Sequence, residues 1–318
     1  MTVSEMRRHV GRYRWVICGL LFFATTINYI DRQVVSVLAP TLRTEFSMSN
    51  SQYAAIVNAF LATYAVSYTF AGWALDRLGV GRGLTLSVIW WSIGDSIPRL
   101  IGASQGPVLS AFPGEICCVT GRPGRSSCAF FADPLWYFFV FWIPEFLARE
   151  RGLNLAGIGQ VAWIPFLVAG AANFVGGYLS LVLQRSGWSV NRTRKSFMVV
   201  ATILTPVGIF AAFAHSLFWT IALISFAVFF WIFWSIAVHS LAGDYFPANA
   251  VASVYGIAGT GSTVGSAIST WAVGYVLDQT HSYPRVFIGL SLLMPVALVV
   301  GFSLMGRVEP VAGVEPQL

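Results

Sequence analysis

Two ionisable residues stand side by side inside an apolar stretch near the start of the chain. Asp31 and Arg32 lie within residues 15–38, and no other residue of this run carries a charge. The planar guanidinium of arginine binds a carboxylate through two parallel hydrogen bonds, which a lysine cannot do. Partial burial makes a carboxylate take up a proton more readily, whereas a neighbouring arginine has the opposite effect. The pair therefore places an anion-binding group, Arg32, next to a proton-binding group, Asp31.

The composition indicates that this pair lies in a membrane. Of the 318 residues, 56% are hydrophobic and only 10% are charged, whereas soluble domains carry about 25% charged residues. A charge at the centre of a bilayer costs at least about 2.5–3.5 kcal/mol, so an intramembrane ionisable pair indicates a functional site. The alternative is that the helix tilts and the pair only caps its outer end, because a long arginine side chain can reach the interface.

Eight segments are apolar and long enough to cross a membrane as helices, which takes about 20 residues. They are residues 15–38, 53–75, 129–147, 155–182, 197–214, 217–239, 250–277 and 286–306. The stretch 94–128 differs, because it is dense in Gly, Pro, Ser and Arg and offers at best one or two doubtful spans. The sequence therefore predicts an all-α polytopic membrane protein with eight clean transmembrane helices.

Basic residues predict how the chain is oriented. They form short clusters before the first span, after the second and in the loop 185–195. The positive-inside rule places all three clusters in the cytoplasm, so both termini are expected there as well. The net charge of +6 is distributed in these clusters rather than along one basic stripe, so no nucleic-acid partner is expected.

Other classes of function have little support in the residues. The four cysteines and four histidines show no metal-ligand spacing, so neither a metal nor another cofactor is expected. "GASQG" at 102–106 matches the G-x-S-x-G pattern of hydrolases, but that motif needs a strand-to-helix turn with an aligned histidine and acid. An enzyme, a receptor or a channel is thus a remote alternative.

A loop after the second span carries a resemblance to a known family. Gly72-x-x-x-Asp76-Arg77-x-Gly79, ending in Arg82, resembles the signature loop between helices two and three of the major facilitator superfamily. Within it, "NYIDR" at 28–32, "QYAAIVNAFLATYA" at 52–65, "FADPLWYFFVFWIPEFL" at 131–147 and "GDYFP" at 243–247 resemble the anion:cation symporter branch. The resemblance covers about 15–93 and 129–306. It fails at 94–128, where helices four to six should lie.

The resemblance implies a function and roles for several residues. Bacterial members of this branch import hexuronates, glucarate or galactonate with protons, which implies proton-coupled uptake of a sugar-acid anion across the bacterial inner membrane. Arg32 would bind the substrate carboxylate and Asp31 would carry the proton, with Tyr29 and Tyr64 as hydrogen-bonding neighbours. The signature loop would form a cytoplasmic gate, against the alternative of a loop that only sets topology. The partners expected are a small organic anion, protons and lipid; the oligomeric state stays open.

Further polar residues are weaker candidates. Tyr137, Trp234 and Ser235 can line a substrate path, but lone polar residues in membrane helices equally often join neighbouring helices. We expect Asp133 to cap a helix that begins near residue 131. Gly261-x-x-x-Gly265 predicts close helix packing.

The chain divides unequally under this interpretation. Residues 1–128 would form an incomplete N-terminal bundle, and residues 129–318 a C-terminal bundle of six helices. Transporters of this kind bind substrate between two comparable halves. The rival hypothesis is therefore a truncated remnant, inserted in the membrane but unable to move substrate.

Overall fold

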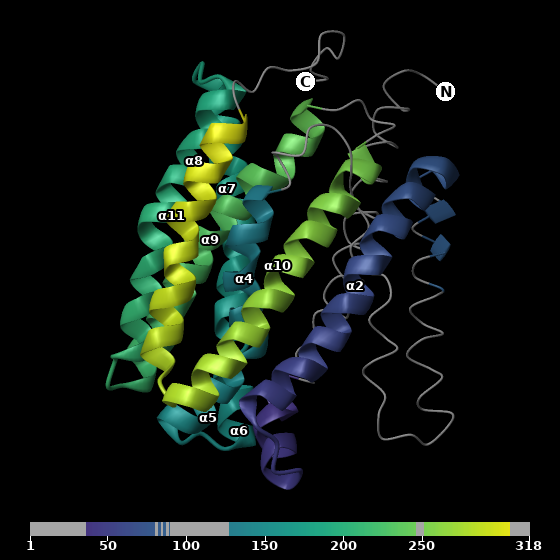
Figure 1. Cartoon of the computed structure of the whole chain (residues 1–318). Coiled ribbons are helices and arrows are strands. Elements are labelled where there is room, and N and C mark those ends of the chain that lie inside the picture. Colours follow the sequence, from purple (N-terminus) through teal and green to yellow (C-terminus); the bar gives the residue numbers. More distant parts are fainter. Residues whose placement is uncertain are drawn as a thin grey trace, which may run out of the picture.

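A computed structural model describes residues 36–79, 127–245 and 251–305, together with residues 82, 83, 85, 86 and 89. Every regular element of this described part is a helix (Figure 1). Asp31, Arg32 and Tyr29 lie outside the described residues, as does nearly all of 94–128.

The helices follow one another with short connections. Residues 36–45 are helical. They are followed by α2 (Asn50–Leu78), α4 (Ser127–Phe141), α5 (Ile143–Arg151), α6 (Leu155–Val161), α7 (Ile164–Arg185), α8 (Val190–Leu204), the 3₁₀ helix η1 (Thr205–Ala212), α9 (Leu217–Tyr245), α10 (Val251–Thr280) and α11 (Tyr283–Met305).

Most of the predicted spans are confirmed. Five helical runs are long and apolar enough to cross a bilayer: Asn50–Leu78, Leu155–Arg185, Val190–Ala212, Leu217–Leu241 and Tyr283–Ser303. A sixth consists of two helices bent by 54°, Phe130–Phe141 and Ile143–Arg151, so the prediction of one segment over 129–147 is wrong in detail. At 30 residues, α10 is about 45 Å long, but its many Gly, Ser and Thr residues leave it outside the apolar set.

The bend between α4 and α5 results from a proline at the start of α5. Pro144 opens α5, and a proline has no N–H to donate to the carbonyl four residues earlier. That carbonyl, Val140 O, instead accepts a hydrogen bond from Ser36 Oγ at 2.6 Å. The next carbonyl, Phe141 O, accepts one from Tyr53 Oη at 3.1 Å. The break in the second half is therefore stabilised by two hydroxyls of the first half.

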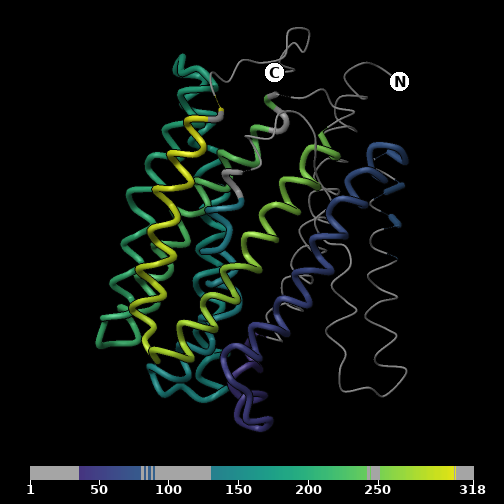
Figure 2. The backbone as a smooth tube through the Cα atoms, viewed as in Figure 1, coloured from purple at the N-terminus to yellow at the C-terminus, as the bar shows by residue number. Residues whose placement is uncertain are grey.

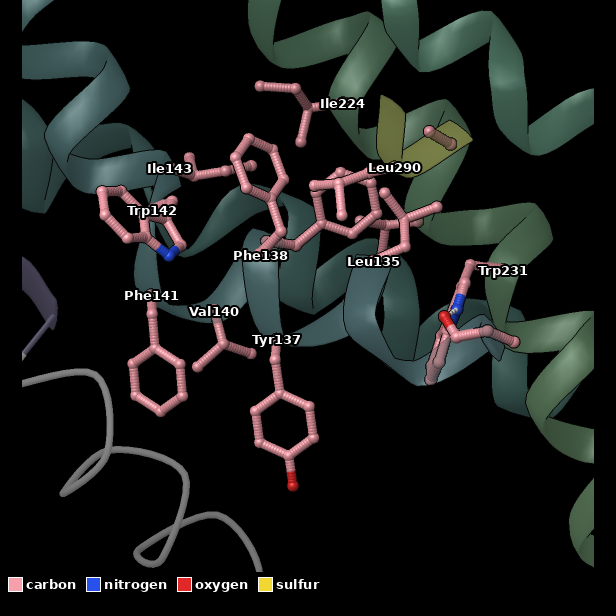
Figure 3. Close-up of a cluster of buried hydrophobic side chains, with 14 of the residues drawn as sticks. Leu135, Tyr137, Phe138, Val140, Phe141, Trp142, Ile143, Ile224, Trp231 and Leu290 are labelled. Atoms are coloured by element: carbon pink, nitrogen blue, oxygen red, sulfur yellow. Dashed lines mark hydrogen bonds between the residues drawn. The ribbon is translucent and has the colours of Figure 1, made fainter. Parts of the chain in front are cut away.

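The core lies among α4, α9 and α11. Leu135 and Phe138 of α4 point toward Ile224 of α9 and Leu290 of α11, whereas Tyr137 and other α4 side chains point to the opposite side (Figure 3). In a bilayer such contacts act through van der Waals packing, because lipid is itself apolar. Thus α4 has one face in the core of the second half and another that is turned away from it.

Helices α2 and α10 lie side by side along much of their length (Figure 2). Glycines of α10 permit this close approach: a Cβ at Gly256 would lie under 3.0 Å from Tyr68 O, and one at Gly274 under 3.0 Å from Asn50 O. Thr260 adds a hydrogen bond from its Oγ1 to Ala65 O at 2.8 Å. We call this contact the α2–α10 seam; it joins the first half to the second.

Candidate functional site

Five aromatic rings form a continuous row between the halves. Tyr137 of α4 stacks on Phe141 at 6.0 Å, and Phe141 meets Phe60 of α2 edge-on at 6.0 Å. Phe60 stacks on Tyr64 at 5.6 Å, and Tyr64 contacts Tyr68 edge-on at 4.8 Å. Ligand sites in proteins commonly combine such aromatic surfaces with a few polar groups. We call these five rings the aromatic band.

The band contains only some of the predicted site residues. Tyr64 and Tyr137 belong to it, and each is largely buried. Trp234 is fully buried in the core of the second half, and its Nε1 has no hydrogen-bond partner among the described residues. Ser235 Oγ lies 3.0 Å from His239 Nδ1 on its own helix. Neither residue takes part in the described ring contacts that form the band.

A buried ion pair joins the two halves at one end of the bundle, the end where α5 and α6 lie (Figure 1). Arg43 Nη1 donates to Glu145 Oε1, and the two side chains are only 4% and 2% exposed. Arg149 Nε also donates to Glu145 Oε1, at 2.6 Å, but its side chain is 42% exposed. We call this the Glu145 end. This pair was not predicted, because Glu145 lies inside the predicted apolar segment 129–147 and Arg43 follows the apolar segment 15–38 at a distance of five residues.

A carboxylate of α10 caps α2 at the same end. Asp278 accepts hydrogen bonds from the backbone N–H groups of Asn50 and Ser51, both at 2.8 Å. Ser49 accepts the next N–H, from Gln52, so the first N–H groups of α2 are satisfied. Asp278 lies beyond the apolar segment 250–277. Burial raises its pKa, but the hydrogen bonds from Ser51 and Asn50 outweigh this and lower it to about 2.

The signature loop lies at the opposite end, which we call the Asp76 end. Asp76 Oδ2 accepts a hydrogen bond from the backbone N–H of Ser253, in the first turn of α10, at 2.6 Å. Arg77 stays on its own helix, with its guanidinium 4.3 Å from the centre of the Trp73 ring. The remaining loop residues contact no charged partner that the structure describes: Gly72 is buried in α2, Gly79 ends α2 with a φ of 79°, and Arg82 is exposed.

The second half has its own charge network near the Asp76 end. Leu181 follows Gly177 by four residues, as Asp76 follows Gly72, so it occupies the matching position of the second half; it is 42% exposed. Arg194 of α8 instead donates to Asp244 of α9 at 2.9 Å and to Ser180 Oγ of α7 at 3.1 Å. One arginine thus joins three helices, and it lies on α8 rather than at the position that matches Asp76.

Asp133 does not cap a helix. Its helix α4 begins at Ser127, so the expectation of a cap near residue 131 is wrong and the carboxylate lies within the helix. Ser262 Oγ of α10 donates to Asp133 Oδ2. Close packing at the glycine pair is confirmed for Gly265, where a Cβ would lie under 3.0 Å from Phe130 O. Among the residues described, no group of three or more His, Cys, Asp and Glu gathers to hold a metal ion.

Residues 21–111 and 126–317 match the model of the Major Facilitator Superfamily. The chain belongs to this superfamily. Its members are transporters rather than enzymes, so the chain is a multi-pass membrane protein of a transporter family. The match is interrupted at 112–125, inside the stretch 94–128 that departs from the family pattern.

Relatives within the superfamily have named substrates. A hexuronate transporter of Escherichia coli (strain K12) is 23% identical, with 94% of this chain and 93% of the relative covered. A probable galactarate/D-glucarate transporter of the same strain, GarP, is 27% identical, with 92% and 95% covered. A hexuronate transporter of Bacillus subtilis (strain 168) is 22% identical, with 88% and 92% covered. The first alignment runs over 415 positions, about 100 more than the 318 residues of this chain.

A solved structure shares the fold. A bacterial homologue of the human lysosomal transporter Spinster, in an inward-facing and occupied conformation, superposes with a TM-score of 0.59 at 12% identity. The superposition covers 92% of this chain and 97% of that one. The shortened superfamily bundle expected from the sequence is therefore confirmed as to fold.

Proposed function

We propose that this chain is a secondary transporter that carries a sugar-acid anion across the bacterial inner membrane together with protons. This proposal is supported by one combined observation: the chain belongs to the superfamily, and its relatives are named as hexuronate and probable galactarate/D-glucarate transporters. Substrates of this class carry carboxylates and several hydroxyl groups, so a site for them needs a cation, hydrogen-bonding groups and flat apolar surfaces.

The proposed site combines the aromatic band with the charged pair of the first span. Arg32 binds the substrate carboxylate and Asp31 carries the coupled proton, with Tyr29 beside them. Tyr64 and Tyr137 offer phenol groups from the two sides of the band, which supports a substrate position between α2 and α4. Residues 1–128 and 129–318 are the two halves that move relative to each other around it.

The two ends of the bundle are assigned to opposite sides of the membrane. The Asp76 end faces the cytoplasm with both termini, because the arginine-rich loops lie there. The Glu145 end faces the outside. Asp76 then acts in the cytoplasmic gate through its hydrogen bond with the start of α10, since a carboxylate near a helix N-terminus is favoured by the helix dipole.

A transport-incompetent remnant is the second candidate function. It is favoured by the interruption of the family match at 112–125 and by the roughly 100 alignment positions that have no residue in this chain. A carrier that has lost helices four to six would lack part of the wall around its substrate. The inserted protein would then bind lipid normally but move no anion.

Uptake into proteoliposomes distinguishes the two candidates. Purified protein is reconstituted, and uptake of labelled glucuronate, galactonate and glucarate is measured with and without an imposed inward proton gradient. We expect gradient-driven uptake of at least one of them by the wild type. Arg32→Ala should abolish it, and Asp31→Asn should leave exchange of substrate but remove the response to the gradient.

Arg285→Ala is the matched control, because it removes an exposed arginine from the start of α11. It should transport like the wild type. No uptake by inserted, folded wild-type protein would contradict transport and support the remnant. Unchanged uptake by Arg32→Ala would contradict the assigned site while leaving transport itself intact.

A further inference from the structure

An acidic residue inside α4 has a setting that the fold alone does not require. Asp133 belongs to the apolar run Phe130–Phe141, one part of the bent span. An ionisable residue within such a span is costly, at least about 2.5 kcal/mol on insertion scales. Because α4 begins six residues before Asp133, the carboxylate does not offset this cost by capping the helix. Its partners must therefore explain its presence.

Those partners come from two other helices. Ser262 Oγ of α10 donates to the carboxylate, and Ser262 is only 6% exposed. The adjacent carbonyl, Ala132 O, accepts a hydrogen bond from Trp231 Nε1 of α9 at 3.1 Å. Asp133 thus lies at a junction of α4, α9 and α10.

The backbone beside Asp133 is also shaped for contact with α10. Pro134 follows it within the helix and has no N–H for the carbonyl of Phe130. Gly265 of α10 approaches that same carbonyl so closely that a Cβ would lie under 3.0 Å from it. A change in the Asp133–Ser262 contact therefore acts where α10 packs closely against the backbone of α4.

The junction is connected to the first half through α10. Gly259, one turn before Ser262, packs directly on the ring of Tyr68 in the aromatic band. Other titratable groups on these helices include the phenols of Tyr137, one turn after Asp133 on α4, and of Tyr64 and Tyr68 on α2. They also include His239 of α9, whose ring stacks on that of Tyr255 of α10. The described hydrogen-bond donors at the junction, Ser262 and Trp231, do not ionise. Asp133 is the carboxylate at this junction, so binding of a proton to it would change the charge between α4 and α10.

We propose that Asp133 is a second proton-binding residue of this transporter, in the half opposite to Asp31, and that its protonation state sets the contact between α4 and α10. As a carboxylate it is stabilised by the hydrogen bond from Ser262; once protonated it is neutral, and that hydrogen bond between the two helices is weakened. Since α10 also forms the seam with α2, the protonation of Asp133 biases the opening between the halves. This role presupposes the proton coupling proposed above.

The test uses full-length protein in proteoliposomes with labelled glucuronate, or whichever of the three sugar acids the wild type transports. Two rates are measured for each variant: uptake driven by an inward proton gradient, and counterflow exchange at equal pH on both sides. Asp133→Asn should keep counterflow within about twofold of the wild type and lose stimulation by the gradient. Asp133→Glu should regain part of that stimulation, because it restores a titratable group.

Ser262→Ala gives an independent readout that keeps the acid. Loss of the donor destabilises the carboxylate relative to its protonated form, so the pH of half-maximal gradient-driven uptake should move upward. Ser269→Ala, on the same helix but farther along it, is the matched control and should leave that pH unchanged. If Asp133→Asn fails to fold, as judged by its melting temperature in detergent, the pH profile of Ser262→Ala by itself tests the role of Asp133.

Each outcome has a distinct meaning. Full gradient stimulation in Asp133→Asn, or an unshifted pH profile in Ser262→Ala, overturns the role of Asp133 and leaves the proposed function standing. Loss of counterflow in folded Asp133→Asn also overturns it, because the residue is then needed for substrate movement as such. A wild type that shows no gradient stimulation contradicts the proposed coupling and the role of Asp133 together.

Discussion

The two partners of the buried ion pair at the Glu145 end should contribute unequally to stability: we expect loss of Glu145 to cost more than loss of Arg43. Glu145→Gln leaves the Arg43 guanidinium buried without its carboxylate partner; the other hydrogen bonds that the structure gives it are two long ones to Met48 O, at 3.3 and 3.4 Å. Removing one partner of a buried ion pair costs about 3–5 kcal/mol, because a buried charge is left uncompensated. Glutamine still offers an acceptor oxygen, so we expect a loss near the lower limit, about 3 kcal/mol.

Arg43→Gln should cost less. Glu145 keeps Arg149 at 2.6 Å, and that arginine is partly exposed to solvent, so the carboxylate remains paired. We expect about 1–2 kcal/mol, mostly from lost hydrogen bonding. In the double variant Arg43→Met with Glu145→Met, both buried charges disappear, so much of the loss should be recovered.

Thermal unfolding in detergent, followed by tryptophan fluorescence, measures these differences. One kcal/mol shifts the melting temperature by about 2–4 °C in mid-sized proteins, so Glu145→Gln should melt roughly 6–12 °C below the wild type. Glu150→Gln, an exposed neighbour in α5, is the matched control and should melt within about 2 °C of it. An Arg43→Gln variant as unstable as Glu145→Gln would refute the compensation by Arg149. A wild-type melting temperature for Glu145→Gln would refute the ion pair itself.

Three further predictions concern other contacts of the described helices, each checked by melting temperature in detergent. Gly256→Ala should destabilise the α2–α10 seam by about 1–3 kcal/mol, since its Cβ would meet a backbone oxygen; Gly170→Ala, with nothing within 4 Å of the added Cβ, should be neutral or slightly stabilising. Asp278→Asn should cost about 1 kcal/mol at pH 7 through loss of a charged cap. Because the folded pKa of Asp278 is about 2 and the unfolded one about 3.9, this contribution is complete above pH 4 and should fade as the pH falls toward 2. Asp244→Asn should cost about 1–3 kcal/mol, because Arg194 is left with neutral partners.

Hydropathy predicted the helices well and their ends less well. The segment 53–75 became α2 over Asn50–Leu78, since an apolar run records only the membrane part of a helix. The helix begins earlier because Ser49 and Gln52 form a reciprocal capping box at its polar start. A capping search added to the hydropathy scan would have found this start.

The bend at Trp142 shows where local sequence stops being informative. Pro134 and Pro144 each remove one N–H from the same predicted segment, but only Pro144 separates two helices. The difference lies in what meets the freed carbonyls. Near Pro144 they accept hydrogen bonds from Ser36 and Tyr53, which are about 100 residues away in the chain, and no local pattern contains that information.

The same limit explains the site residues. Tyr64 was implied by the family resemblance and Tyr137 was one of the weaker polar candidates; both belong to the aromatic band, and their role in binding stays a prediction. Arg43 looked like any arginine that follows an apolar segment, and Arg285 still fits that description, since it is exposed. What distinguishes Arg43 is Glu145, a partner 102 residues away. A long-range pairing of this kind follows from the packing of the halves and not from either local sequence.

The contacts between the halves are unequal, and this bears on which end opens more readily. At the Glu145 end, opening must break a buried ion pair and the hydrogen bonds from Asn50 and Ser51 to Asp278. At the Asp76 end, the hydrogen bond between Asp76 and the start of α10 is the described charged contact across the seam. Charged hydrogen bonds contribute about 1.5–3 kcal/mol each, so among the described residues the contacts between the halves are stronger at the Glu145 end than at the Asp76 end. If the chain transports, its resting state is therefore closed at the Glu145 end, and the larger free energy is needed to open toward that side. Binding of substrate and protons would have to supply this free energy. A second titratable residue on α4, in contact with α10, would let a proton contribute to it.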